Sequence, residues 1–344
     1  MLNPREELVF LLRGFFATPL LTALGKKGIL DSFVKGKVDL ANFKEDSNID
    51  FLEHSFIYLQ SLGLLKRSTE SSTIFMSTDL GNKVFKRFGS FVLLYSYRDL
   101  VANIDKLLFD KHIDPPKCDR LDNVIGSGLT NGRKFFPSGI KALGSNDFSV
   151  IVDLACGDGE FLSRMHEVYP RASIVASDIS PIAIESTTNN LLSKYPEICL
   201  NTVQTDALNV ENWMSIVIRQ KDKIGDGKII ISMWYLIHEI ARHSTNVVAD
   251  FLTDIYNSCS DAHLLLGEIV NVSPEQLAFS HHESIMPEFL FFHELSGQGV
   301  LTWDQYQQLL DLIPYKLISE QKFDTVGNDS NQIPSAIVWY LQPK

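Results

Sequence analysis

The apolar residues in the second half of the chain gather in short runs, and each of the first five runs ends in or contains a polar or acidic residue. Runs rich in Val and Ile are typical of strands buried in a parallel sheet. Between them, apolar residues return at helical spacing, as at Phe161, Leu162 and Met165. The pattern predicts an α/β fold with strands at 150–153, 172–178, 203–208, 227–233 and 262–270, then a helix at 301–312, a strand at 315–323, a loop at 327–331 and a strand at 336–341, with the last two strands closing the sheet antiparallel.

A tight glycine turn follows the first strand, which ends at Asp153, and Gly157 and Gly159 of this turn precede a helix. Glycine permits positive φ and close approach of a ligand, and the new helix offers free N–H groups. Leu162 stands where the dinucleotide motif G-x-G-x-x-G needs its third glycine, and the Gly-Lys-Ser/Thr of a P-loop is absent. The turn therefore indicates either a ligand site of another kind or an ordinary connection between strand and helix.

Acidic residues also end the second and third runs, at Asp178 and Asp206. Because an open α/β sheet binds its ligand at the carboxyl ends of its strands, we expect these acids near the glycine turn. This ordered pattern resembles the class I S-adenosylmethionine-dependent methyltransferases. The resemblance implies a Rossmann-like sheet of seven strands, with the glycine turn near the methionine part and ribose of the cofactor. It also implies that Asp178 accepts the ribose hydroxyls and that Asp206 contacts the adenine amino group.

The full set of cofactor residues that the resemblance implies includes one residue from outside the sheet. Arg133 follows a glycine-rich segment just before the sheet, where it could bind a carboxylate of the cofactor or the substrate. The alternative for Arg133 is a solvated side chain near a turn. The set is Asp153, Gly157, Gly159, Asp178, Asp206, Ala207, Met233 and Arg133.

The first 90 residues show helical periodicity at 5–34, with Pro19 as an expected break. Phe15 and Phe16 are expected in the core, with a dimer contact as the alternative. Residues 39–87 then predict two helices, a two-stranded wing and a third helix, which is a winged-helix layout. Such modules often bind DNA, but the recognition segment has no arginine and the chain carries a net charge of −11. The layout resembles the N-terminal dimerisation domain of the plant O-methyltransferase type.

Three segments therefore divide the 344 residues. We predict a winged-helix, dimerisation-type domain at 1–90, a helical connector and lid at 91–146, and the catalytic methyltransferase domain at 147–344. Residues 91–109 are expected to form one apolar helix. The resemblance of the first segment implies a homodimer.

The composition bounds the environment and the partners. The four cysteines have no C-x-x-C spacing and predict free thiols in a reducing cytoplasm. No signal peptide is recognisable, and we expect no membrane-spanning run. The acidic charge argues against nucleic acid as a partner. We therefore expect a cytoplasmic protein that acts on a small molecule.

His238 is the principal catalytic candidate, because it stands just past the fourth strand of the sheet. In the O-methyltransferases that the chain resembles, a His-Asp or His-Glu pair occupies this place, and the histidine takes the proton of the substrate hydroxyl. Imidazole titrates near neutral pH, which suits that role. Glu239 is the expected partner that orients His238.

A second histidine opens a different possibility. His293 and Gln298 fall in a segment that faces the substrate in this fold, and together with His238 they predict a metal site with open positions. His281 and His282 are expected at the surface or at a helix start. The two main histidines resemble those of the α-keto acid C-methyltransferases, such as the phenylpyruvate C-methyltransferases, and of the mononuclear-iron methyltransferase domains of polyketide synthases. In the keto-acid branch, two such histidines hold the metal.

The main hypothesis from the sequence is a C-methyltransferase of secondary metabolism that acts on an enolisable keto-acid or malonyl-type substrate, free or tethered to a carrier protein. S-adenosylmethionine supplies the methyl group, and one divalent metal (Fe, or else Mn or Zn) stabilises the enolate. One alternative is a metal-free O-methyltransferase with His238 as general base. Another is a winged-helix regulator that senses S-adenosylmethionine, against which the acidic N-terminal region argues.

Overall fold

The computed structural model describes residues 4–225, 227–242, 244–277, 285–326 and 332–344. The chain divides into two compact units. The first contains Met1–Arg98 and Cys118–Thr130, and the second contains Asp99–Lys117 and Asn131–Lys344. The proposed connector at 91–146 contributes residues to both units, so the three-segment division stays a prediction.

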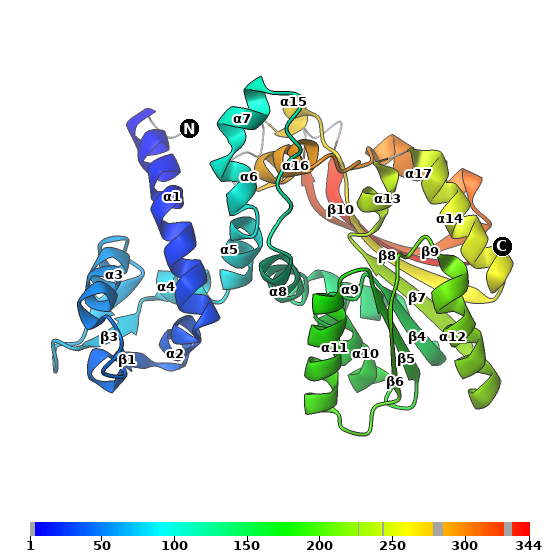
Figure 1. The fold of residues 1–344 in the computed structure, drawn as a ribbon, viewed down its shortest axis with the longest axis horizontal. Coiled ribbons are helices and arrows are strands. Elements are labelled where there is room, and N and C mark those ends of the chain that lie inside the picture. The colour runs from blue at the N-terminus through cyan, green and yellow to red at the C-terminus, as the bar shows by residue number, and fades with distance from the viewer. Residues whose placement is uncertain (1–3, 226, 243, 278–284, 327–331) are drawn as a thin grey trace. The chain divides into compact units, whose positions relative to one another are not determined.

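The second unit is built on one sheet of seven strands in the order β6-β5-β4-β7-β8-β10-β9 (Figure 1). The five strands from β6 to β8 are parallel, and β10 runs antiparallel to both β8 and β9. This confirms the predicted α/β fold and its antiparallel closure. The strands are β4 Phe148–Leu154, β5 Ser173–Asp178, β6 Leu200–Gln204, β7 Lys228–Trp234, β8 Ala262–Ile269, β9 Tyr315–Val326 and β10 Ile333–Pro343.

Helices cover both faces of this sheet, as Figure 1 shows. One layer consists of α9 Phe135–Ala142, α10 Glu160–Val168 and α11 Pro181–Lys194. The other consists of α12 Val210–Ile224, α13 Ile237–Ala241, α14 Thr245–Ser258 and α17 Trp303–Leu312. The unit also contains α6 Arg98–Ala102, whose first residue belongs to the other unit, and α7 Ile104–Phe109, α15 Pro274–Leu277 and α16 Met286–Leu295.

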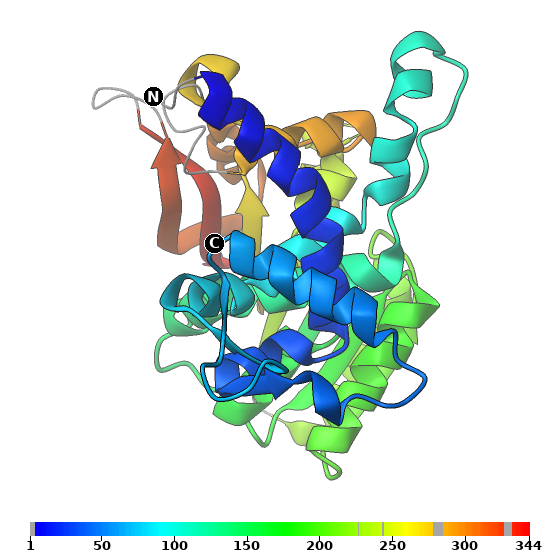
Figure 2. The ribbon, with the colours of Figure 1, turned by 90° about the vertical axis from the view of Figure 1, so that its left-hand side faces the viewer.

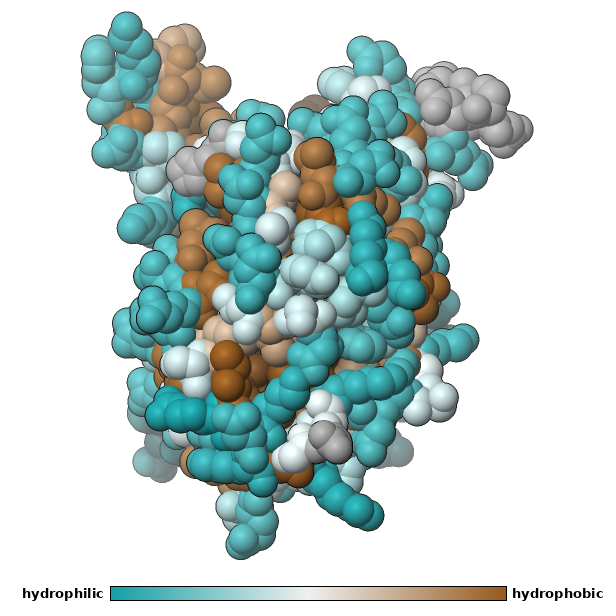
Figure 3. All heavy atoms as spheres, turned by 90° about the vertical axis from the view of Figure 1, so that its right-hand side faces the viewer, coloured by the Kyte–Doolittle hydropathy of each residue, from teal (hydrophilic) through white to brown (hydrophobic). Residues whose placement is uncertain are grey.

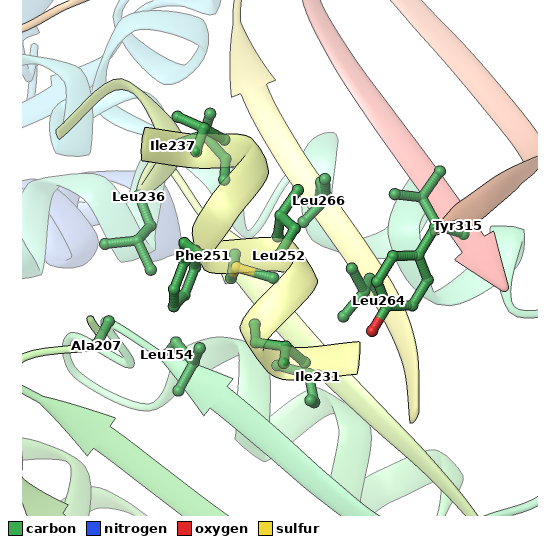
Figure 4. Packing of buried hydrophobic residues seen from close by; sticks show 14 of the residues in the cluster. Leu154, Ala207, Ile231, Leu236, Ile237, Phe251, Leu252, Leu264, Leu266 and Tyr315 are labelled. Atoms are coloured by element: carbon green, nitrogen blue, oxygen red, sulfur yellow. The ribbon is translucent and has the colours of Figure 1, made fainter. Parts of the chain in front are cut away.

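Strand periodicity separates the two cores of the sheet. Val150, Val152 and Leu154 of β4 face one cluster, whereas Ile151 between them faces the other. Successive side chains of a strand point to opposite faces, so a continuous apolar run fills both cores. Figure 4 shows part of the first cluster, in which Phe251 and Leu252 of α14 lie among strand residues. This packing fixes the ends of the strands at one edge of the sheet.

The outer surface is mainly polar on the face drawn in Figure 3, where hydrophilic residues surround smaller apolar patches. Scattered apolar residues are normal on a folded protein, because there is too little polar surface to cover it.

The first unit combines helices with a small antiparallel sheet of order β1-β3-β2. Four aromatic side chains, Phe33, Phe56, Phe75 and Phe85, are fully or almost fully buried in its core. The strand β1 was not predicted, and whether the unit is a winged helix stays a prediction. Its elements are α1 Pro4–Lys26, α2 Ile29–Lys35, β1 Lys37–Asp39, η1 Leu40–Asn42, α3 Ile49–Ser61, β2 Leu65–Arg67, β3 Ile74–Ser77, α4 Asp79–Phe85, α5 Phe88–Tyr95 and α8 Arg120–Asn131, the last residue of which belongs to the other unit.

Three expectations about the helices of the N-terminal region are wrong. α1 continues through Pro19 as one helix, drawn dark blue in Figures 1 and 2. Proline removes one helical hydrogen bond, but the burial of Leu21 and Leu24 holds the second half of the helix in place. Phe15 and Phe16 are 75% and 63% exposed and not in the core. The segment 91–109 is divided among α5, α6 and α7.

α1 also departs from the expectation that no apolar run reaches membrane-spanning length. Within the described residues it is the one helix that is long and apolar enough to cross a bilayer. Length and composition alone support this, and a core helix or a signal sequence meets the same criterion. The cytoplasmic location therefore stays a prediction.

Candidate functional site

The predicted cofactor residues begin at the edge of the sheet where β4, β5 and β7 end. In the register of these parallel strands, Leu154 pairs with Ser177 on one side and with Met233 on the other. Met233 is fully buried. The pairing brings the glycine turn after β4 beside the end of β5, so Asp153 and Asp178 lie at the same edge.

The backbone of the glycine turn is left-handed at three positions, Ala155 (φ 59°), Gly157 (φ 61°) and Gly159 (φ 78°). Two of these are glycines, for which this conformation carries no steric penalty, but Ala155 is not. Gly159 directly precedes α10, whose first N–H groups therefore face the turn. The turn is thus held in a conformation that an L side chain disfavours, as is common at ligand sites.

Asp178 and Thr187 fix the turn through hydrogen bonds. Asp178 Oδ2 accepts from the Gly157 N–H at 3.2 Å, and its Oδ1 accepts from the Ser180 N–H at 2.8 Å. The hydroxyl of Thr187, in α11, donates to the Gly157 carbonyl at 2.9 Å. The carboxylate that the resemblance assigns to the ribose therefore also shapes the turn.

Asp153 is buried, and Ser232 of β7 is its hydrogen-bond partner. The Ser232 hydroxyl lies 2.6 Å from Asp153 Oδ1 and 2.9 Å from the Val152 carbonyl oxygen. Burial raises the pKa of the Asp153 carboxyl to about 8, although the Ser232 hydrogen bond opposes this. The nearby carboxylates of Asp178 and Asp158 raise it further. Burial also raises the pKa of Asp158 to about 6.

The acids at this edge fit the charge of the cofactor that the resemblance implies. S-adenosylmethionine carries a sulfonium and an ammonium group, and a cluster of three carboxyl groups, Asp153, Asp158 and Asp178, favours bound positive charge. The glycine turn supplies backbone that a ligand can approach closely. The residues present therefore match a cationic ligand with hydroxyl groups.

The remaining predicted cofactor residues lie outside the glycine turn. Asp206 follows β6, and its carboxylate accepts the Leu208 N–H at 3.0 Å. Ala207 is buried, and its carbonyl accepts a hydrogen bond from the Trp213 indole at 2.9 Å. Arg133 is exposed between α8 and α9. A role for these residues in binding the cofactor stays a prediction.

His238 lies in α13, directly after β7, and pairs with Glu268 of β8. The distance from His238 Nδ1 to Glu268 Oε2 is 3.0 Å, and the side chains are 5% and 1% exposed. The second oxygen of Glu268 accepts the Ile237 N–H at 2.5 Å. Burial lowers the pKa of His238, but the charge and hydrogen bond of Glu268 outweigh it, so the pKa is raised.

Glu239 does not make the contact with His238 that the sequence predicts. Adjacent residues of a helix point in different directions, so Glu239 cannot share the face of its neighbour in α13. Its carboxylate instead accepts a hydrogen bond from the Gln298 amide. Glu268 therefore takes the orienting position that was expected for Glu239.

His293 lies in α16, and the structure brings it close to His238. The ring centroids of the two histidines are 4.9 Å apart. The Phe289 ring stacks on His293 at 4.0 Å between centroids, and the Phe289 carbonyl oxygen lies 2.6 Å from His293 Nδ1. Burial, and to a lesser extent the charge of His238, lowers the pKa of His293 to about 3. His293 is therefore neutral near pH 7.

Gln298 joins the two histidines through the segment after α16. Its backbone N–H donates to the His293 carbonyl at 2.8 Å, and the next N–H, of Gly299, donates to the His238 carbonyl at 3.0 Å. Within the described ranges, no three His, Cys, Asp or Glu residues form a group that could hold a metal. His281, His282 and the loop 327–331 lie outside the described residues.

Sequence reasoning did not single out two further residues at this edge. Tyr235 has a φ of 56° and precedes His238 by three residues. It joins the strand end to α13, and its N–H donates to the Gly267 carbonyl at 2.9 Å. Ser232, the partner of Asp153, is fully buried inside an apolar strand. Ser232 could have been found from the sequence, because it is a polar residue within an apolar strand. The positive φ of Tyr235 has no counterpart in the sequence.

Comparison with known proteins places this architecture. No family model matches the sequence, and no curated protein matches it. Solved structures do match over the full chain. The crystal structure of LaPhzM has a TM-score of 0.64 at 16% identity and covers 100% of both chains. Human N-acetylserotonin methyltransferase in complex with SAM has a TM-score of 0.63 at 14% identity and covers 100% of this chain and 98% of its own.

An O-methyltransferase family protein from Burkholderia thailandensis has a TM-score of 0.62 at 12% identity and covers 100% of this chain and 99% of its own. The fold is that of the S-adenosylmethionine-dependent methyltransferases. At these identities the likeness shows the fold alone. What the fold does in this chain follows from the residues at the edge of its sheet.

Proposed function

We propose that the chain is a methyltransferase that moves the methyl group of S-adenosylmethionine to a hydroxyl oxygen of a small molecule, with His238 as general base. The observation that carries the proposal is the buried pair of His238, which follows β7, and Glu268, near the end of β8. Both strands belong to the same parallel sheet as β4, which the glycine turn follows. Neighbouring structures named as O-methyltransferases support the same reaction class.

The cofactor residues give the first half of this function. When bound, S-adenosylmethionine supplies an electrophilic methyl group on a positively charged sulfur. Asp178 and the backbone of the glycine turn would hold it, because they present oxygen acceptors and an accessible backbone at the end of β5 and β4. Asp153 adds a buried carboxyl group under the same turn. These residues bind and orient, and none of them needs to exchange a proton with the substrate.

His238 gives the second half. Its Nδ1 atom is committed to Glu268, so Nε2 remains to accept the proton of a substrate hydroxyl. The Glu268 carboxylate then stabilises the imidazolium that forms, which is consistent with the raised pKa of His238. A carboxylate that orients a histidine and stabilises its charge has the same role in hydrolytic triads.

A second candidate, C-methylation assisted by a metal, is kept because of one observation. His238 Nδ1 faces a carboxylate and His293 Nδ1 faces a carbonyl, an outer-shell arrangement that is common for metal-bound histidines. The donor set is weak, however, since its third member would be the neutral amide oxygen of Gln298. Both nearby carboxylates already have hydrogen-bond partners: Glu268 is paired with His238, and Glu239 accepts from Gln298. The metal-free reaction is therefore the first candidate.

The proposal is tested by separating cofactor binding from methyl transfer in the full chain. We expect calorimetry to show that Asp178→Ala loses affinity for S-adenosylmethionine, whereas His238→Ala retains it. Transfer of a labelled methyl group to a panel of phenols should fall about 100-fold or more in His238→Ala, the usual range for a lost general base.

Two results would count against the proposal. Undiminished affinity in both Asp153→Ala and Asp178→Ala contradicts the cofactor site. Methylation of α-keto acids but not of phenols, lost with a chelator and in His293→Ala, favours the metal-dependent candidate.

A further inference from the structure

Two hydrogen-bond acceptors near His238 lack a donor among the described residues. They are His293 Nε2 and Gln298 Oε1, and His238 Nε2 itself is a third acceptor when the ring is neutral. In each of the three side chains, the N–H group that can donate is already hydrogen-bonded to a protein oxygen. The partner of each side chain shows which of its atoms carries that hydrogen.

The tautomer of His293 follows from its contact with Phe289. A carbonyl oxygen can only accept, so the 2.6 Å contact requires His293 Nδ1 to carry the proton. A neutral imidazole has one N–H group, and the neutral form is favoured because the ring is buried and makes no hydrogen bond or ion pair with a carboxylate of the described residues. His293 Nε2 therefore presents a lone pair and cannot donate.

The orientation of the Gln298 amide follows in the same way. A carboxylate also only accepts, so the atom of Gln298 that contacts Glu239 must be the amide nitrogen. The amide oxygen is left, and it is buried without a hydrogen-bond partner. A buried acceptor without a donor is destabilising, and native structures contain few of them.

The two acceptors are held in place relative to His238. The backbone hydrogen bonds of Gln298 and Gly299 tie the segment to His293 and to α13. At Gly299 the approach is so close that a Cβ would lie 2.5 Å from the Arg242 nitrogen. With 4.9 Å between the rings of His238 and His293, groups on neighbouring atoms of one small molecule can reach both.

We propose that His293 and Gln298 determine specificity by accepting hydrogen bonds from a second donor of the substrate, next to the hydroxyl that His238 deprotonates. This inference rests on the proposed function and adds a substrate class to it. The class consists of small molecules in which an O–H or N–H group stands on the atom adjacent to the methylated hydroxyl. A molecule with a single hydroxyl would leave the buried Gln298 Oε1 atom unpaired.

Ligand binding, measured by calorimetry with and without S-adenosylhomocysteine, tests the inference independently of catalysis. The probes are 1,2-dihydroxybenzene and 2-aminophenol, compared with phenol and 2-methoxyphenol. We expect the two-donor probes to bind roughly tenfold more tightly, the effect of about one hydrogen bond. The preference should fall to about one in His293→Phe and in Gln298→Met, and it should return in His293→Gln, which restores an acceptor. Gln308→Met, at an exposed position of α17, is the matched control and should keep the wild-type preference.

The outcomes separate the inference from the function on which it rests. Equal binding of all four probes, or none in the millimolar range, overturns the inference. So does a preference that appears only with added Fe²⁺ or Mn²⁺, since the acceptors would then be metal ligands. A preference that depends on His293 without any methyl transfer supports the inference and overturns the proposed O-methylation.

Discussion

The hydrogen bonds of the Ser232 hydroxyl indicate the protonation state of the buried Asp153 carboxyl. Ser232 lies within hydrogen-bond distance of both the Asp153 carboxyl and the Val152 carbonyl, but its hydroxyl has one proton to donate. If Asp153 is protonated, it donates to Ser232 and Ser232 donates to Val152, so all three groups are satisfied. Ionised Asp153 competes with the carbonyl for that proton. The geometry thus agrees with the raised pKa of Asp153.

We therefore predict that cofactor binding releases a proton from Asp153. The pKa of about 8 means that the carboxyl is mostly neutral below pH 8, and a cationic ligand favours the ionised form. The affinity for S-adenosylmethionine should rise with pH up to about 8 and then level off. Calorimetry in buffers of different ionisation enthalpy measures the protons released.

Other groups near Asp153 provide the controls for this prediction. Asp178, Asp158 and the Cys156 thiol are the titratable neighbours, and His238 also titrates at the same edge of the sheet. Asp153→Asn should bind more weakly and release about one proton fewer at pH 7. Equal release by wild type and Asp153→Asn would assign the proton to another of these groups.

The same residue has the opposite effect on folding. A folded-state pKa above the ordinary value of 3.8 means that the unfolded chain binds fewer protons between pH 4 and pH 8. The contribution of Asp153 to stability therefore falls as the pH rises through this window. Under the proposed function, Asp153 would be a binding residue kept at a cost in stability.

At the scale of elements, the strand-to-helix connections carry the strain of the site. The turn between β4 and α10 contains Ala155, and the connection between β7 and α13 contains Tyr235, both at positive φ. A left-handed conformation costs an L residue roughly 1–2 kcal/mol, and glycine avoids it. Both residues lie at the edge of the sheet that holds the proposed site.

We predict that Ala155→Gly stabilises the protein. The relief of strain exceeds the entropic cost of glycine, which is about 0.5–1 kcal/mol, so we expect a gain of roughly 0.5–1 kcal/mol. Ala249→Gly, in the interior of α14, is the control and should lose about 1 kcal/mol, since its backbone is helical. Denaturant unfolding measures both, and a destabilised Ala155→Gly variant would contradict the assigned conformation.

Sequence reasoning reached the elements of this site better than the contacts between them. The apolar runs predicted the strands and their shared edge because burial on both faces leaves a continuous signal. The partner of His238 could not be found this way. Glu239 is adjacent in sequence but its carboxylate accepts from the Gln298 amide, whereas Glu268 comes from the next strand of the sheet, 30 residues on. Such pairing depends on the register of β7 and β8, which no local pattern encodes.

At the scale of the whole molecule, the first half of α1 is the most exposed apolar feature of the first unit. Six of its large apolar residues are more than half exposed, a density that is unusual for a monomer. They are Leu8, Phe10, Leu11, Leu12, Phe15 and Phe16. Sequence reasoning expected Phe15 and Phe16 in the core because periodicity shows that a face is apolar but not what covers it.

We predict that a second copy of the chain covers this face, giving a homodimer. Light scattering at micromolar concentration should show about twice the monomer mass of 38.8 kDa. The double variant Leu11→Glu with Phe15→Glu should be monomeric and folded, because both side chains are exposed. Phe109→Glu, on α7, is the matched control and should stay dimeric. A wild-type monomer would contradict the prediction and leave a bilayer as the other candidate for this apolar helix.

The close contact between Gly299 and α13 has a consequence for engineering this protein. Gly299 is held against α13, and Gln298 is hydrogen-bonded to His293. The number of residues between α16 and Gly299 is therefore fixed by these contacts. A one-residue insertion there would displace both acceptors together and leave the His238 pair with Glu268 untouched. Residues 286–299 should therefore be exchanged together when this proposed specificity is moved into a related scaffold. Introducing His293 alone would leave out the backbone hydrogen bonds that position it relative to His238.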